Sequence, residues 1–238
     1  MGQGSTAGAR NNAWLYALFV VCAVLAIVGS LLAGGHQSGW RWLHYLTKPT
    51  ATLFLLVAVL RNIGPSSRAY ATAIVIGLAF AAAGDFFLML PGDYFLAGLV
   101  CFLLTHCAYI WALTRDSRFA ADKRIFALFA VIGFIVIAGL WSSLPSAMRI
   151  PVVIYALALA AMAAQAISRD RQLVVGTPEK SAARSAALGG LFFMVSDTLL
   201  AYGRFRWDIP YNAIWVLGTY YTAQWLFARS TEGNAHAG

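Results

Sequence analysis

The sequence predicts an all-α, polytopic membrane protein, a bundle of eight transmembrane helices. Of its 238 residues, 61% are hydrophobic and only 11% are charged, whereas a soluble domain carries about 25% charged residues. Such a chain cannot cover a surface that faces water, so its solvent must be lipid. A transmembrane helix takes about 20 apolar residues, and the chain has room for eight such helices with short connections and no separate soluble domain.

Eight apolar runs follow one another along the chain. The first is preceded by Arg10 and followed by small residues, as in a signal peptide. Its apolar core is longer than the roughly 7–15 residues of such a segment, so we expect a true first helix. We also expect disordered tails over residues 1–12 and 229–238, on either side of one transmembrane domain over 13–228. The runs lie at 13–33, 47–61, 70–90, 94–114, 124–143, 149–167, 184–203 and 209–228.

The net charge of +8 could suggest nucleic-acid binding, but the Lys and Arg residues fall between the apolar runs. That distribution is typical of membrane orientation. If the N-terminus is inside, the inner segments hold twelve basic residues and the outer segments five. We therefore expect both termini in the cytoplasm, in the inner membrane of a bacterial cell. The basic clusters at 115–124 and 169–184 are expected to be cytoplasmic loops near anionic headgroups.

A faint internal repeat favours an even number of helices. The third run ends in GDFFL at 84–88, and the seventh ends in SDTLL at 196–200. The run after each carries an aromatic residue, a polar residue four positions later and an aromatic residue three positions after that. We expect two four-helix halves in the same orientation, as in many duplicated membrane folds. The matching residues are Phe102, His106 and Tyr109 in one half and Tyr220, Gln224 and Phe227 in the other.

Three ionisable residues stand out in the interior of the predicted helices: Asp85, Asp197 and His106. A charge at the bilayer centre costs about 2.5–3.5 kcal/mol or more, so such residues face protein or water and usually have a function. Asp85 shares a helical face with Gly77 and Ala81, whose small size lets helices approach closely, and Asp197 follows two glycines by two turns. Both aspartates are expected five or six residues from the outer end of their helices, roughly 8 Å deep. We expect the two carboxyls to share a cavity.

A purely structural alternative exists for each of these residues. Each aspartate could bond only a neighbouring helix or an arginine such as Arg204 or Arg41, and a lone histidine is often a core residue. Lys48, followed by Pro49, is expected to open the second helix at the outer boundary. There it is either a snorkelling flank residue or a partner for a phosphate or an aspartate. The candidates for binding substrate are Lys48, His106, Tyr109, Ser196, Tyr220, Tyr221 and Gln224.

Two carboxyls in a cavity of low dielectric suit general acid–base chemistry. Desolvation and like charge favour keeping one carboxyl protonated while the other ionises. The neutral carboxyl can donate a proton, and the ionised one can stabilise a cation or activate water. A site at this depth would be reached by a lipid from the membrane.

The chain resembles the YhhN family of integral membrane proteins, the lysoplasmalogenases. The residues that carry the resemblance are Lys48-Pro49, GDFFL at 84–88, FLLTHCAY at 102–109, FMVSDTL at 193–199, and Tyr220-Tyr221 with Ala223-Gln224. They are spread over most of the chain in the family's order. The resemblance implies hydrolysis of the vinyl ether bond of a lysophospholipid, the lysoplasmalogen. The products would be a fatty aldehyde and a glycerophospho-ethanolamine or -choline, with one of Asp85 and Asp197 as proton donor and the other as stabiliser or base.

Other functions remain open at this point. No cofactor is expected. However, a typical catalytic zinc ion has three protein ligands, and Asp85, Asp197 and His106 could in principle supply three. Intramembrane acids and a duplicated half also occur in transporters and proton-coupled carriers. A non-catalytic lipid-binding protein is the third class. Turnover of lysoplasmalogen in detergent distinguishes an enzyme from the last two.

Overall fold

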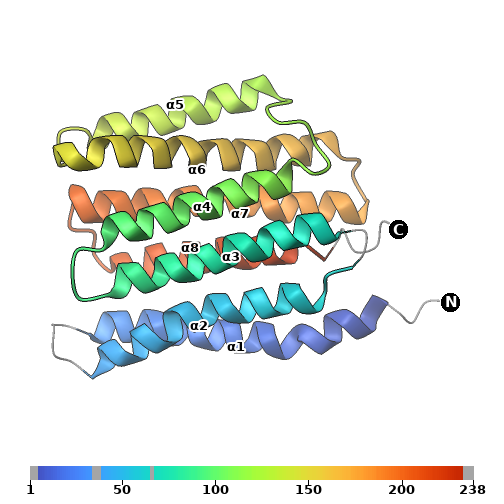
Figure 1. Ribbon diagram of the computed structural model, residues 1–238, viewed down its shortest axis with the longest axis horizontal. Coiled ribbons are helices and arrows are strands. Elements are labelled where there is room, and N and C mark those ends of the chain that lie inside the picture. The colour runs from blue at the N-terminus through green and yellow to red at the C-terminus, as the bar shows by residue number, and fades with distance from the viewer. Residues whose placement is uncertain (1–4, 34–38, 65–66, 233–238) are drawn as a thin grey trace.

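The computed structural model describes residues 5–33, 39–64 and 67–232, and the regular structure within these residues is entirely helical. Eight helices lie side by side along the long axis of the molecule (Figure 1), which confirms the predicted fold class. They are α1 (Ser5–Leu32), α2 (Trp40–Arg61), α3 (Arg68–Met89), α4 (Phe95–Leu113), α5 (Lys123–Leu140), α6 (Ser146–Gln172), α7 (Pro178–Phe205) and α8 (Asn212–Arg229).

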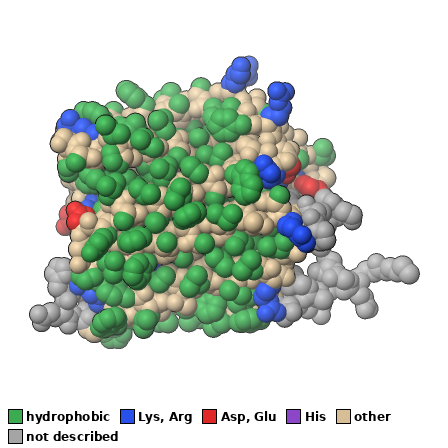
Figure 2. Space-filling model, viewed as in Figure 1, with side chains coloured by type: hydrophobic (Ala, Val, Ile, Leu, Met, Phe, Trp, Pro, Cys, Tyr) green, Lys and Arg blue, Asp and Glu red, His purple; other side chains and the backbone are tan. Residues whose placement is uncertain are grey.

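Seven of these helices, α1 to α7, are long and apolar enough to cross a membrane. The eighth, α8, has a lower mean hydropathy because it carries Tyr220, Tyr221 and Gln224, all of which are buried. It packs against α1, α2, α3 and α7, so these polar side chains face other helices rather than lipid. Figure 2 shows apolar side chains covering one face of the bundle, while Lys and Arg gather at its two ends.

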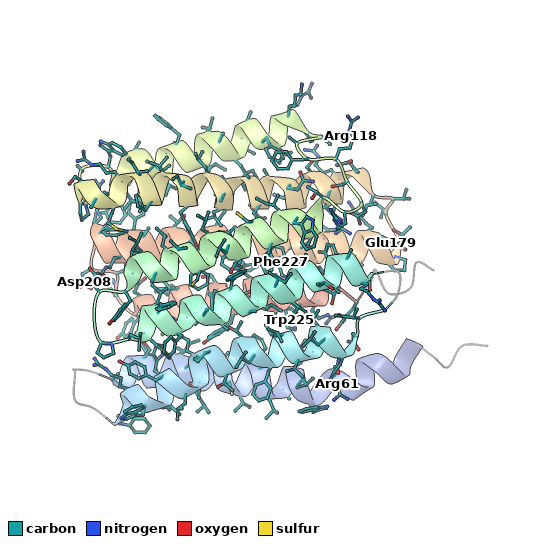
Figure 3. The ribbon with its side chains drawn as sticks, viewed as in Figure 1. Arg61, Arg118, Glu179, Asp208, Trp225 and Phe227 are labelled. Atoms are coloured by element: carbon teal, nitrogen blue, oxygen red, sulfur yellow. The ribbon has the colours of Figure 1, made fainter. Side chains whose placement is uncertain are left out.

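The two ends of the bundle differ in the segments that they carry. Helices α1, α3, α5 and α7 end at one end of the bundle, here called the loop end, whereas α1 begins and α8 ends at the other, the terminal end (Figure 1). Asp208 marks the loop end, whereas Arg118 and Glu179 mark the terminal end (Figure 3). The twelve basic residues of the segments predicted to lie inside fall at the terminal end. That this end faces the cytoplasm stays a prediction.

Both tails are more ordered than the sequence predicted. Helix α1 begins at Ser5, eight residues before the first apolar run predicted from residue 13. Two turns into α1, the Asn12 amide donates to the Ala58 carbonyl of α2 at 3.1 Å. Past the last helix, the hydroxyl of Ser230 lies 2.7 Å from that of Tyr70. These contacts tie residues 12 and 230 to the bundle; residues 1–4 and 233–238 lie outside the described part of the chain.

The second helix begins seven residues before its predicted start. It starts at Trp40, because residues 40–46 contain no glycine or proline and their aromatic side chains suit a membrane interface. Lys48 and Pro49 therefore lie in the third turn rather than at the helix start, which corrects the prediction. Proline at this place removes the hydrogen bond to the carbonyl four residues earlier. Lys48 is also not a flank residue, since it is only 7% exposed.

Arg169 was expected in a cytoplasmic loop, but it is buried within α6 near the terminal end. The helix extends to Gln172, five residues past the predicted run, and carries the guanidinium into the bundle. There Nε and Nη2 donate to the two carboxylate oxygens of Asp116 at 2.7 and 2.6 Å, and the group lies 5.0 Å from the centre of the Tyr70 ring. A bidentate carboxylate and an aromatic face together offset the cost of burying the charge.

The packing of the helices supports the predicted internal repeat. If α1–α4 correspond to α5–α8, the contact between α2 and α8 has its counterpart in that between α6 and α4, and both occur. Tyr109 and Phe227 occupy corresponding positions in the two halves, and their rings stack on each other with centroids 4.2 Å apart. A contact between equivalent residues is what an approximate two-fold axis through the bundle produces.

Gly77 lets α3 approach the Tyr109 ring of α4. A Cβ at position 77 would lie 2.2 Å from Cε1 of Tyr109, and that ring is buried and stacked on Phe227. We expect Gly77→Ala to destabilise the protein by about 1–3 kcal/mol, seen as a lower melting temperature in detergent by circular dichroism. Gly218→Ala in α8 is the control, since a Cβ there meets nothing within 4 Å and should leave stability equal or higher. Equal melting temperatures for Gly77→Ala and the parent would contradict this packing argument.

Candidate functional site

Asp85 lies in the bundle interior, 1% exposed, with three donors around its carboxylate. The Lys48 ammonium lies 3.4 Å from Oδ1. Oδ2 accepts from the Thr52 hydroxyl at 3.1 Å and from the Tyr220 hydroxyl at 2.6 Å. Helices α2, α3 and α8 thus each supply part of this group, which we call the Asp85 cluster. Its donors, one of them an ammonium ion, suit a carboxylate.

Hydrogen bonds extend the Asp85 cluster along α8 towards α4. The Gln224 amide donates to the Tyr220 hydroxyl at 3.2 Å, and its carbonyl oxygen accepts from the Tyr109 hydroxyl at 2.6 Å. The Tyr221 hydroxyl donates to the backbone carbonyl of Lys48 at 3.4 Å. Two residues predicted to bind substrate, Lys48 and Tyr220, therefore contact Asp85 directly. Two others, Tyr221 and Gln224, are linked to it through one neighbour, and all four are buried.

Asp197 belongs to a second group, the Asp197 cluster, built from α4, α6 and α7. The Tyr155 hydroxyl donates to its Oδ2. Nε2 of His106 lies 3.0 Å from the Tyr155 hydroxyl and 3.4 Å from Oδ2 of Asp197. Nδ1 of His106 is buried and has no hydrogen-bond partner among the described residues. Among the described residues, the side chains paired with the Asp197 carboxyl are thus a phenol and an imidazole, with no lysine or arginine.

Aromatic rings separate the two clusters. The Phe193 ring lies 5.8 Å from the Tyr220 ring and 5.0 Å from the His106 ring, edge to face in both cases. The Phe102 ring lies 5.8 Å from Tyr220 and 6.5 Å from Phe193. The expectation that both carboxyls share one cavity is therefore not met by this arrangement, in which apolar rings stand between two polar groups.

The two aspartates also lie at different distances from the ends of their helices, whereas the sequence predicted a common depth. Asp85 is four residues before the end of α3, and Asp197 is eight before the end of α7. At 1.5 Å per residue these offsets correspond to about 6 and 12 Å. Both lie in the half of their helix nearer the loop end, as expected, but Asp197 lies further from its helix end because α7 continues to Phe205.

Two cavities adjoin near the loop end of the bundle. One, the crevice, is apolar, encloses about 50 Å³ and lies between α4, α5, α6 and α7, with Asp197 and Tyr155 in its wall. The other, the vestibule, has a volume of about 330 Å³ and lies between α2, α7, α8 and the α3–α4 connection, with Lys48 in its wall. Asp85 lines neither. The residues that line both cavities are Leu88, Phe95 and Leu200.

The remaining candidates are placed as follows. The Ser196 hydroxyl donates to the Val216 carbonyl at 3.1 Å, so it lies at the contact between α7 and α8 and joins neither cluster. The Arg204 guanidinium pairs with Asp93 at 2.9 Å, not with Asp85 or Asp197. Among the residues that the structure describes, no three His, Cys, Asp or Glu side chains gather where they could hold a metal ion.

Two site residues were not predicted from the sequence, Thr52 and Tyr155. Thr52 follows Lys48 by four residues and so lies on the same face of α2, which was a usable signal. Tyr155 is a lone aromatic in an Ala- and Leu-rich run, where it reads as ordinary packing. Only the approach of α6 to α4 and α7 shows that its hydroxyl meets Asp197.

Comparison with known proteins gives consistent matches. The YhhN family model matches residues 43–231. Human lysoplasmalogenase TMEM86A is 32% identical over 161 residues, which cover 67% of this chain and 65% of that protein, so the match spans less than two thirds of its length. Pig lysoplasmalogenase TMEM86B is 30% identical over 92% of this chain and 86% of its own. The lysoplasmalogenase of Mycobacterium tuberculosis is 31% identical over 79% and 71%. No solved structure matches the chain.

Proposed function

The chain belongs to the YhhN family, and on that premise we propose that it is a membrane hydrolase that cleaves the vinyl ether bond of lysoplasmalogens. The products are a fatty aldehyde and a glycerophospho-ethanolamine or -choline. The observation that supports this most directly is a carboxyl, Asp197, in the wall of an apolar crevice and bonded to Tyr155. A proton donor in apolar surroundings that a lipid can enter is what this reaction requires.

Hydrolysis of a vinyl ether begins with a proton. Its transfer to the vinyl carbon remote from oxygen uses the π electrons of the double bond and leaves an oxocarbenium ion. Water adds to the cationic carbon and loses a proton to a base. The resulting hemiacetal then breaks its bond to the glycerol oxygen, which takes up a proton, while the hemiacetal hydroxyl loses its proton to form the aldehyde carbonyl. One proton donor that becomes a base after the first step can therefore serve the whole sequence.

We assign the proton transfer to Asp197. The Tyr155 hydroxyl donates to Oδ2 of Asp197, and Nε2 of His106 lies 3.4 Å from the same oxygen, so these two residues fix the position of the carboxyl in the crevice wall. After the transfer, the carboxylate stabilises the oxocarbenium ion and accepts the proton of the attacking water. The crevice volume of about 50 Å³ admits a water molecule beside it.

Asp85 has a different role in this proposal. It is buried behind Lys48, away from both cavities, so it acts as a positioning residue that holds the Lys48 ammonium and the Tyr220 hydroxyl. The two acids thus have different roles because they lie at different places in the bundle. One is a catalytic residue that meets the substrate, and the other fixes the side chains at the entrance to the site.

Tyr155→Phe tests the support given to Asp197. The change removes the hydroxyl that bonds both Asp197 and His106 while keeping the ring that packs in the crevice wall. We expect kcat to fall about 10- to 100-fold with KM unchanged, measured as aldehyde release in detergent. Tyr202→Phe is the control, since among the described residues its hydroxyl donates to the Val136 carbonyl alone, at 3.4 Å. A drop of the same size in both variants would mean that the loss is one of packing.

The activity itself is tested by incubating the purified protein in detergent with a panel of lyso-lipids. Mass detection should find aldehyde and glycerophosphodiester in equal amounts from vinyl ether lipids and neither product from ester- or alkyl-linked ones. Substrate flux in sealed vesicles without product in detergent would instead identify a carrier. Affinity for the lipid without any product would identify a lipid-binding protein.

A further inference from the structure

The vestibule has a mixed polar wall that the proposed chemistry does not use. Its cationic side chains are Lys48 of α2 and Arg204 of α7. Its acceptors include Asp93, in the connection between α3 and α4, and Asn212, at the start of α8, and Ser30 and His44 also line it. Four separate segments therefore bring two positive groups and two acceptor groups to one cavity at the loop end. An apolar lipid tail would gain nothing from such a wall.

The two cations retain capacity for a further ligand. The Lys48 ammonium lies 3.4 Å from Asp85, longer than the 2.7–2.9 Å or so of a strong charge-assisted bond, and it has three N–H groups to offer. Arg204 pairs with Asp93 through Nη2 at 2.9 Å, while the guanidinium lies over the Phe95 ring at 5.6 Å. A guanidinium has five N–H donors in a planar fork that matches phosphate oxygens.

The acceptors also lack a full set of partners. Oδ1 of Asn212 is buried and accepts no hydrogen bond from any described residue. A buried acceptor left without a donor costs stability, and such a group in a cavity wall points to a donor supplied by a ligand. Asp93 is 75% exposed, so its second carboxylate oxygen is accessible from the same cavity.

We propose that the vestibule is a site for a zwitterionic lipid headgroup, with the phosphate held by Lys48 and Arg204 and a primary ammonium held by Asn212 and Asp93. This inference rests on the proposed function in taking the headgroup to be that of the substrate. It goes further by selecting ethanolamine over choline, because the ethanolamine ammonium has N–H groups for Asn212 whereas the choline nitrogen has none.

The position of the vestibule relative to Asp197 fits such a substrate. Asp197, Leu200 and Arg204 lie on one face of α7, and Leu200 lines both cavities. Seven residues of helix separate Asp197 from Arg204, a rise of about 10 Å. In a lysoplasmalogen, about seven bonds separate the vinyl carbon that takes the proton from the phosphorus atom, an extended length of about 8 Å. A headgroup in the vestibule therefore leaves the double bond within reach of Asp197.

The experiment measures binding of lipids that cannot be hydrolysed by this route. The probes are three 1-alkyl lysophospholipids without a double bond, which carry phosphoethanolamine, phosphocholine or phosphate alone. Binding to the purified protein in detergent is followed by tryptophan fluorescence. We expect the ethanolamine lipid to bind several-fold more tightly than the choline lipid. Arg204→Gln should weaken all three about tenfold, whereas Asn212→Ala should weaken only the ethanolamine lipid.

Arg206→Gln is the matched control, since Arg206 is exposed at the same end of the bundle, over the Trp207 ring, and does not line the vestibule. Its binding of all three lipids should equal that of the parent, and melting temperatures verify the fold of each variant. Equal affinity for the three lipids, or equal losses in Arg204→Gln and Arg206→Gln, would overturn the proposal. The probes require no turnover, so the headgroup site can stand if vinyl ether hydrolysis is not found, and hydrolysis can stand if the headgroup site fails.

Discussion

Asp197→Asn is expected to abolish aldehyde release, with a loss of at least about 1,000-fold in kcat. The substitution keeps the size and the hydrogen bond from Tyr155 but replaces the carboxyl in the crevice wall by an amide, which cannot give a proton and take it back. The loss should appear in kcat more than in KM, because the amide still fits beside the substrate. Aldehyde release from a vinyl ether lysolipid in detergent is the measurement.

The comparison with Asp85→Asn makes this prediction specific. Because Asp85 holds Lys48 and does not line either cavity, its variant should lose affinity for lipid and thermal stability while a measurable kcat survives. Asp208→Asn, at the loop end of the bundle (Figure 3), should change neither. If Asp85→Asn is the inactive variant and Asp197→Asn turns over normally, the roles of the two acids are reversed and the assignment is wrong.

The fold was predictable because lipid imposes a simple rule on sequence. Every span must be an apolar helix of sufficient length, and eight runs therefore gave eight helices in their correct order. The bounds were less accurate where hydropathy and helix formation disagree. Residues 40–46 carry Arg41 and His44, which lowers the hydropathy of a segment that is helical. For the same reason, the predicted sixth run ended at residue 167, because the polar residues that follow have low hydropathy although they are helical. Arg169 was therefore predicted to lie outside the bundle.

The site was predictable only as a set of residues. The cost of burying a charge identified Asp85 and Asp197, but it says nothing about which partners they have. Those partners come from helices that are distant in sequence, Tyr220 of α8 for Asp85 and Tyr155 of α6 for Asp197. The separation of the two acids by Phe193 depends on side-chain packing between helices, which a pattern along one helix does not encode.

The Lys48–Asp85 ion pair should show strong coupling in stability. The Asp85 side chain is 1% exposed and that of Lys48 is 9% exposed, so removing one partner leaves a charge that is poorly hydrated. Breaking such a buried pair costs about 3–5 kcal/mol. We expect Lys48→Met to approach that cost, because Asp85 cannot reach water. Asp85→Asn should cost less, because Lys48 lines the vestibule and its flexible stem can carry the ammonium into it.

The double variant decides between an ion pair and two independent side chains. With Lys48→Met and Asp85→Asn together, no buried charge is left unpaired, and Tyr220 and Thr52 can still donate to the amide oxygen at position 85. Its melting temperature in detergent should therefore lie above that of Lys48→Met alone, even though it carries one more substitution. If the two losses simply add, the residues are energetically independent, and Asp85 cannot act through Lys48 on the headgroup site. The recovery of stability by a second mutation is thus the measurement on which the role of Asp85 depends.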